Sequence, residues 1–73
     1  MAKEIQIFKI KEPIHVGGLK IEISDDITTE LIKYENGDIK VRYKHNSGNE
    51  FLSNPISKEF NKLIWQKAQQ QQQ

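Results

Sequence analysis

Apolar and polar residues alternate in several short segments of this chain, as they do in β-strands. Residues 4–10 are rich in β-branched and aromatic side chains and predict a first strand. Ile5 and Ile7 fall on one side of this strand, while Phe8 and Ile10 fall on the other. Because neither side is wholly polar, we expect both faces of the strand to be partly covered.

A first hairpin is predicted around Gly17-Gly18, since glycine tolerates the positive φ angles of a two-residue turn. Such a turn pairs Val16 with Leu19, His15 with Lys20 and Ile14 with Ile21. The two apolar pairs then share one face, and the polar pair lies on the other. This separation is typical of half-buried strands.

A second hairpin, over residues 30–44, is predicted around Asn36-Gly37, the dipeptide that best suits a two-residue type I′ turn. On a mostly apolar side, this turn pairs Tyr34 with Ile39, Ile32 with Val41 and Glu30 with Tyr43. On the other side it pairs Lys33 with Lys40, Leu31 with Arg42 and Thr29 with Lys44. The second side therefore gathers four cations, namely Lys33, Lys40, Arg42 and Lys44.

Residues 27–35 leave a second interpretation open. Asp26 is a suitable N-cap, Gly37 is a suitable residue after a helix end, and the apolar residues between them recur at helical spacing. Thr28, Thr29 and the Asn-Gly placed directly before an alternating segment favour a hairpin instead. We expect the hairpin, with a helix as the alternative.

The C-terminal part of the chain predicts a turn at residues 46–49, a short strand at residues 50–52 and then a helix. Asn54 is the expected N-cap and Pro55 the expected first helical residue. The expected apolar stripe of this helix consists of Ile56, Phe60, Leu63, Ile64 and Lys67. Residues 69–73 are all glutamine and predict a frayed or disordered tail.

These elements predict an α+β fold: a small antiparallel β-meander of four or five strands with one C-terminal α-helix packed on it. We expect a single domain over residues 1–68, followed by the Gln-rich tail at residues 69–73. A chain of 73 residues buries only about 60% of its unfolded surface, so good packing or self-association must supply its stability.

Composition narrows the class of protein. The chain has no cysteine, which excludes disulfides and the common zinc sites and is consistent with a cytoplasmic protein. Its net charge is only +1, and every cation except Arg42 is lysine, which does not favour a specific nucleic-acid reader. No apolar run is long enough to predict a membrane span. The abundance of Ile, Lys and Asn suggests an AT-rich gene of bacterial, phage or mobile-element origin.

Candidate catalytic and metal-binding residues are few. His45 and Ser47 are close in sequence, but they lie in a predicted turn with no third group to orient them. Glu22, Asp25 and Asp26 cluster near a strand end, yet their spacing matches no defined calcium loop. We therefore predict no enzyme activity, no catalytic or metal-binding residue and no cofactor.

Trp65 is the clearest candidate for a protein contact. At about 100° per residue it lies about 140° around the helix from Phe60, away from the expected apolar stripe. Its neighbours on the helix surface include Lys58, Asn61 and Lys62, which are all polar. Tryptophan is enriched at interface hot spots, so we predict a protein-interaction surface formed by these residues.

Two functions follow from these two surfaces. The first is a small non-enzymatic protein-interaction or structural module that acts through its sheet surface and C-terminal helix, with a partner protein or a second copy bound at Trp65. The alternative is a nucleic-acid-binding β-module that contacts phosphates through Lys33, Lys40, Arg42 and Lys44. The predicted apolar environment of the two tyrosines disfavours the alternative, because nucleic-acid platforms combine cations with exposed aromatic rings.

Overall fold

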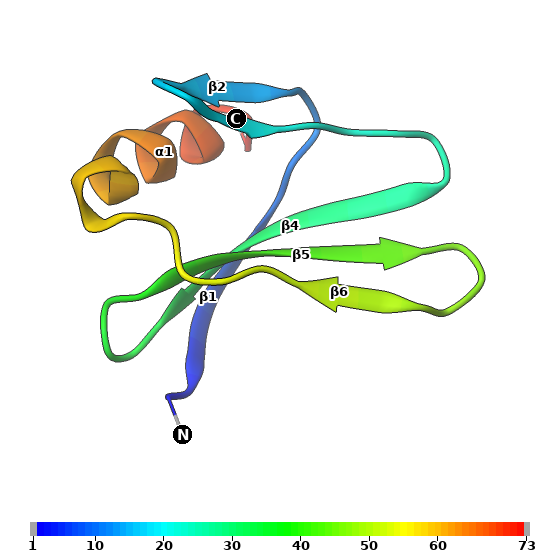
Figure 1. The fold of residues 1–73 in the computed structure, drawn as a ribbon, viewed down its shortest axis with the longest axis horizontal. Coiled ribbons are helices and arrows are strands. Elements are labelled where there is room, and N and C mark those ends of the chain that lie inside the picture. The colour runs from blue at the N-terminus through cyan, green and yellow to red at the C-terminus, as the bar shows by residue number, and fades with distance from the viewer. Residues whose placement is uncertain (1, 73) are drawn as a thin grey trace.

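An antiparallel four-stranded sheet is the centre of the fold in this computed structural model, which describes residues 2–72 (Figure 1). Its strands, in spatial order, are β1 (Glu4–Lys9), β4 (Ile27–Tyr34), β5 (Ile39–His45) and β6 (Glu50–Leu52). A separate two-stranded sheet consists of β2 (Ile14–Val16) and β3 (Leu19–Ile21), and the helix α1 spans Lys58–Gln70. The predicted α+β fold, an antiparallel sheet with a C-terminal helix packed on it, is confirmed.

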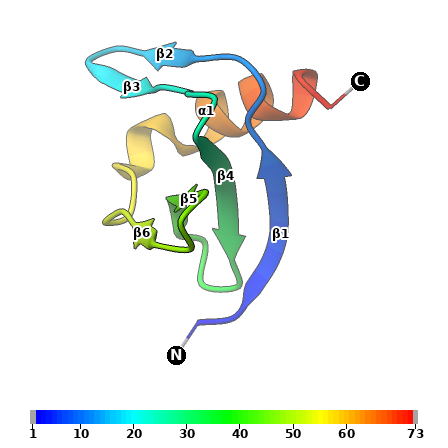
Figure 2. The same ribbon diagram turned by 90° about the vertical axis from the view of Figure 1, so that its right-hand side faces the viewer.

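The connectivity departs from a simple meander. β4, β5 and β6 are neighbours in both sequence and space, but β1 pairs with β4 rather than with β2 (Figure 2). The β2–β3 hairpin comes between β1 and β4 in the sequence and forms its own sheet. This hairpin has the predicted register around Gly17-Gly18. Gly17 has a φ of 58°, and a Cβ at this position would lie 3.2 Å from the Phe60 ring. The positive φ of the turn therefore favours glycine at this position, and the Phe60 ring leaves little room for a larger residue.

Residues 27–35 form a hairpin strand and its turn rather than a helix, but the predicted two-residue type I′ turn is wrong. The N–H of Tyr34 donates to the carbonyl of Asp38 at 2.9 Å, and the N–H of Gly37 donates to the carbonyl of Tyr34 at 3.0 Å. Gly37 has a φ of 91°, whereas Asn36 lacks the positive φ that a type I′ turn needs. The loop therefore has three residues, and the Asn36 side chain accepts a hydrogen bond from the Asp38 N–H at 3.0 Å.

The longer loop shifts the register of β4 and β5 by one residue. Leu31 pairs with Val41, and Lys33 pairs with Ile39. Because successive side chains alternate between faces, Lys33 lies on the face that carries Ile39, and Lys40 lies on the opposite one. The four predicted cations therefore do not share a face.

The helix begins at Lys58 rather than at Pro55, and its N-cap is Ser57 rather than Asn54. The segment before it continues beside β5, since the N–H of Ser53 donates to the carbonyl of Val41 and the N–H of Ile56 donates to that of Ile39. These two bonds to β5 keep the segment around Asn54 and Pro55 extended, so the helix starts only after them.

One hydrophobic core fills the space between the four-stranded sheet, α1 and the β2–β3 hairpin. From α1, Ile64 and Ala68 are fully buried, and Phe60 packs partly against the same cluster. Leu63 is 47% exposed, so its assignment to the apolar stripe is wrong. Ile56 is buried, but it lies before the helix.

The glutamines extend the helix beyond the predicted domain boundary at residue 68. Gln69 and Gln70 belong to α1, and Gln71 is its C-cap. The Gln71 side chain accepts hydrogen bonds from the N–H groups of Lys11 and Glu12 at 2.8 and 3.1 Å, and donates to the Glu12 carbonyl at 2.8 Å. Ordered contacts thus replace the frayed tail predicted at these positions, while residue 73 lies outside the described part of the chain.

Candidate interaction surface

Trp65 lies at the border between the core and the surface. Its ring packs on Phe8 of β1 with a centroid separation of 4.5 Å, and the Lys33 ammonium sits 4.8 Å from its centroid. The prediction that Trp65 points away from the core is therefore wrong, because β1 covers one side of the ring. The ring remains only partly buried, so another side of it faces the surface.

A groove of about 410 Å³ borders the uncovered side of Trp65, between α1 and the β4–β5 loop. We call it the Trp65 groove and define it by its lining residues: Lys33, Gly37, Ile39, Asn61, Lys62, Trp65 and Gln66. Of the predicted interaction residues, the structure brings Trp65, Asn61 and Lys62 together at this groove. Lys58 is exposed at the start of α1 and does not line the groove.

Asn61 connects the helix to the hairpin loop. Its amide nitrogen donates to the Gly37 carbonyl at 3.4 Å, which is long for a hydrogen bond of this kind. Its Oδ1 atom is buried and has no hydrogen-bond partner within residues 2–72. Few polar atoms in folded proteins are buried without a partner, so this acceptor is open to a further hydrogen-bond donor.

The electrostatics of the groove have one sign. Lys33 and Lys62 are its charged lining residues, and both are cations. Asp38 follows Gly37 in the chain but does not line the groove, and its carboxylate accepts a hydrogen bond from the Asn36 side chain at 3.2 Å. The groove therefore combines an apolar floor, formed by Trp65 and Ile39, with a positively charged border.

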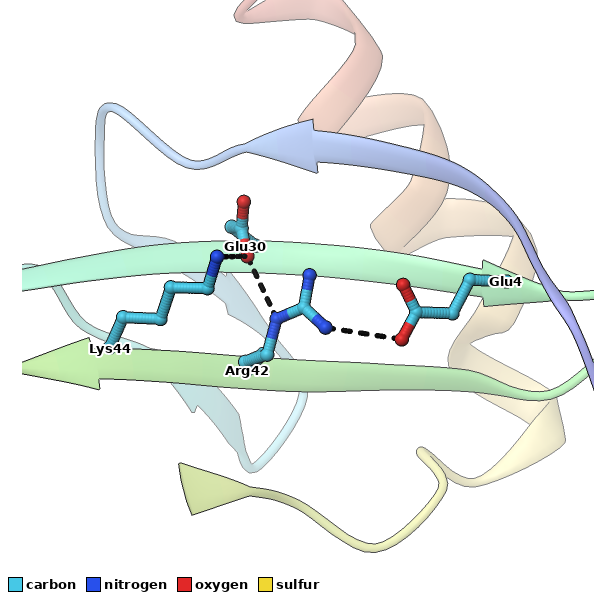
Figure 3. A network of polar contacts seen from close by, with 4 residues as sticks. All are labelled: Glu4, Glu30, Arg42 and Lys44. Atoms are coloured by element: carbon cyan, nitrogen blue, oxygen red, sulfur yellow. Dashed lines mark hydrogen bonds and ion pairs between the residues drawn. The ribbon is translucent and has the colours of Figure 1, made fainter. Parts of the chain in front are cut away.

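The predicted basic face is replaced by a network of ion pairs on the sheet face turned away from α1, which we call the open face (Figure 3). Arg42 Nε lies 2.9 Å from Glu30 Oε1, and Arg42 Nη1 lies 3.1 Å from Glu4 Oε2. Lys44 Nζ lies 3.6 Å from the same oxygen of Glu30. Burial lowers the pKa of Arg42, but the hydrogen bond to Glu30 and the charges of the nearby glutamates outweigh this effect and raise it.

Lys40, another cation of the predicted basic face, also has a partner nearby. Lys40 Nζ lies 5.1 Å from the ring centroid of Tyr34, a buried residue of the open face. Burial and the charge of Glu4 raise the pKa of Tyr34, while Arg42 acts in the opposite direction. Carboxylates or an aromatic ring thus compensate the open-face cations, and the phosphate-binding field predicted for them is weakened.

The polar turns have little catalytic organisation. His45 Nδ1 accepts the backbone N–H of Ser47 at 3.0 Å and lies 2.9 Å from its hydroxyl, in an exposed turn. His15 is exposed on β2. Residues 2–72 contain no group of three or more His, Cys, Asp or Glu side chains placed to hold a metal ion.

The sequence did not predict four residues that line the Trp65 groove: Lys33, Gly37, Ile39 and Gln66. Lys33 was expected on the basic face instead. A three-residue loop at Asn36-Gly37 would have placed Lys33 and Ile39 together, since the two are paired in that register.

No helix within the described residues is long and apolar enough to cross a membrane. Comparison with known protein families, curated proteins and solved structures finds no match for this chain.

Proposed function

We propose that this chain is a small non-enzymatic protein-interaction module and that it binds a partner protein in the Trp65 groove. The observation that carries the proposal is a partly exposed tryptophan beside a groove with an apolar floor. Tryptophan is one of the residue types that are enriched at interface hot spots. Its packing on Phe8 fixes the ring before a partner arrives, which limits the entropy lost on binding.

The rival function, a nucleic-acid-binding module, has less support. Lys33 lies on the other side of the sheet from Lys40, Arg42 and Lys44, and these three already have partners within the chain. A phosphate backbone would have to compete with Glu30 for Arg42. We place the module in the cytoplasm on its cysteine-free composition, and we keep a phage or mobile-element origin as a proposal from its Ile, Lys and Asn content.

Position-specific photocrosslinking in the cells that make the protein tests this proposal. A photoreactive residue at Gln66, which lines the groove, is compared with one at Glu59, which is exposed on α1 and does not line it. We expect a discrete protein adduct from position 66 and none from position 59. The adduct should be lost in Trp65→Ala and kept in Leu63→Ala.

Each other outcome has a defined meaning. Equal adducts from both positions, or none from position 66, would contradict the proposed docking site. An adduct that disappears on nuclease treatment would favour the nucleic-acid module. An adduct with twice the mass of the chain would identify a second copy as the partner.

A further inference from the structure

We infer that the Trp65 groove takes a protein segment in which an apolar side chain is flanked by carboxylates. This inference rests on the proposed function and names the chemistry of its partner. It combines the charge of the groove border, the unpartnered Asn61 oxygen and the apolar floor.

The charge of the groove selects an acidic partner. Lys33 and Lys62 border the groove, and no carboxylate from residues 2–72 lines it. A carboxylate can approach Lys33 while its ammonium stays above Trp65, because the ring occupies only one side of the cation. Like charges at an interface are strongly unfavourable, so the same two lysines disfavour a basic segment.

The Asn61 oxygen selects a peptide rather than a free acid. A carboxylate offers no hydrogen to an acceptor, whereas a peptide backbone supplies N–H groups. Asn61 is held by a single bond of 3.4 Å to the Gly37 carbonyl, which is weak enough for the side chain to turn and present Oδ1. A partner N–H would then satisfy an acceptor that has no partner within residues 2–72.

The floor selects an apolar side chain between the carboxylates. Trp65 provides a flat aromatic surface, and the buried side chain of Ile39 lines the same groove. The volume of about 410 Å³ has room for a side chain of leucine or phenylalanine size together with the peptide backbone that carries it. Burying such a side chain supplies the affinity, and the flanking charges supply the preference.

Synthetic peptides test this chemistry directly on the folded protein. The probes are three acetylated and amidated peptides that share a central Leu-Phe pair and carry glutamate, glutamine or lysine on both sides. The sequence contains 1 tryptophan, so the fluorescence of Trp65 reports binding without a label. The Asn61 side-chain amide and the Gly37 N–H are followed by NMR in the same titration.

At low salt we expect the glutamate peptide to bind about tenfold more tightly than the glutamine peptide, and the lysine peptide to bind least. Binding should shift the Trp65 emission and the Asn61 amide signals together. In a Lys33→Glu and Lys62→Glu variant, the order of the three peptides should reverse. Lys33 is half-buried beside Trp65, so circular dichroism and thermal melting check that this variant keeps the fold. The matched Lys20→Glu and Lys67→Glu variant changes two exposed lysines and should keep the original order.

Equal binding of the three peptides, or the same order in both variants, would overturn the inference. The crosslinking experiment at position 66 separates this failure from that of the proposed function. If the adduct at position 66 persists in the Lys33→Glu and Lys62→Glu variant, the groove binds a partner of different chemistry. If position 66 gives no adduct at all, the proposed function itself is wrong.

Discussion

Replacing Gln71 with alanine should destabilise the domain, even though this glutamine belongs to a low-complexity tail. Its side chain makes three hydrogen bonds to the segment between β1 and β2, with lengths of 2.8, 3.1 and 2.8 Å. An intramolecular hydrogen bond contributes about 0.5–1.5 kcal/mol net, and ordering a glutamine costs up to about 2 kcal/mol. We therefore expect a loss of about 1–2 kcal/mol, which is a large fraction of the stability of a domain this small.

The assay combines a global and a local measurement. A loss of 1 kcal/mol lowers the melting temperature of a domain of this size by about 4–8 °C. Hydrogen exchange should accelerate at the N–H groups of Lys11 and Glu12, which both donate to the Gln71 oxygen. The control is Gln70→Ala, because Gln70 is exposed and its side chain makes no hydrogen bond within residues 2–72. Unchanged melting and unchanged exchange at residues 11 and 12 in the Gln71 variant would refute this reasoning.

Three further predictions test the packing, the ion pairs and the buried phenol. Ile64→Ala should lower the free energy of unfolding in urea by about 2–5 kcal/mol because Ile64 is fully buried, whereas the exposed Leu63→Ala should lower it by less than about 1 kcal/mol. The reverse order would show that the helix packs its Leu63 face, and not its Ile64 face, on the core. A double-mutant cycle with Glu30→Gln and Arg42→Met should give a coupling of about 1–2 kcal/mol in the free energy of unfolding, because the two side chains are only 17% and 18% exposed. A coupling near zero would show that this ion pair does not stabilise the fold. Because the pKa of Tyr34 is raised in the folded protein, the unfolded chain loses this phenol proton first as the pH rises above about 10, and the free energy of unfolding should fall there. Urea midpoints should therefore fall less steeply with pH in Tyr34→Phe than in the unchanged protein. Parallel curves for the two proteins would contradict this role of Tyr34.

The two hairpins show where local sequence determines register and where it does not. At Gly17-Gly18 a two-residue turn was predicted, and the register is confirmed. Asn36-Gly37 suits both a two-residue turn and a three-residue loop with glycine last. The predicted pairing of the flanking strands follows from the two-residue turn alone. The observed loop pairs Leu31 with Val41, so two buried residues face the same core.

The error at the helix has a related origin. Local signals at Asn54-Pro55 predict a helix start, but hydrogen bonds from Ser53 and Ile56 to β5 keep this segment extended. Such bonds join residues far apart in sequence, and no local pattern reports them. Counting Ile56 as helical then rotated the expected stripe away from Ala68, which is fully buried. The apparent isolation of Trp65 followed from that rotation.

The same one-residue register shift explains why the groove was not predicted as a site. With a two-residue turn, Lys33 would lie opposite Lys40 on a cationic surface that faces solvent. The sheet face that packs on α1 would then carry no lysine from β4. With the observed three-residue loop, Lys33 pairs with Ile39 and reaches over Trp65. The loop also places the Gly37 carbonyl within reach of Asn61. The conformation of this loop therefore determines both the cationic border of the groove and its polar anchor. The remaining cations lie on the open face, where Arg42 and Lys44 contact carboxylates and Lys40 contacts the Tyr34 ring.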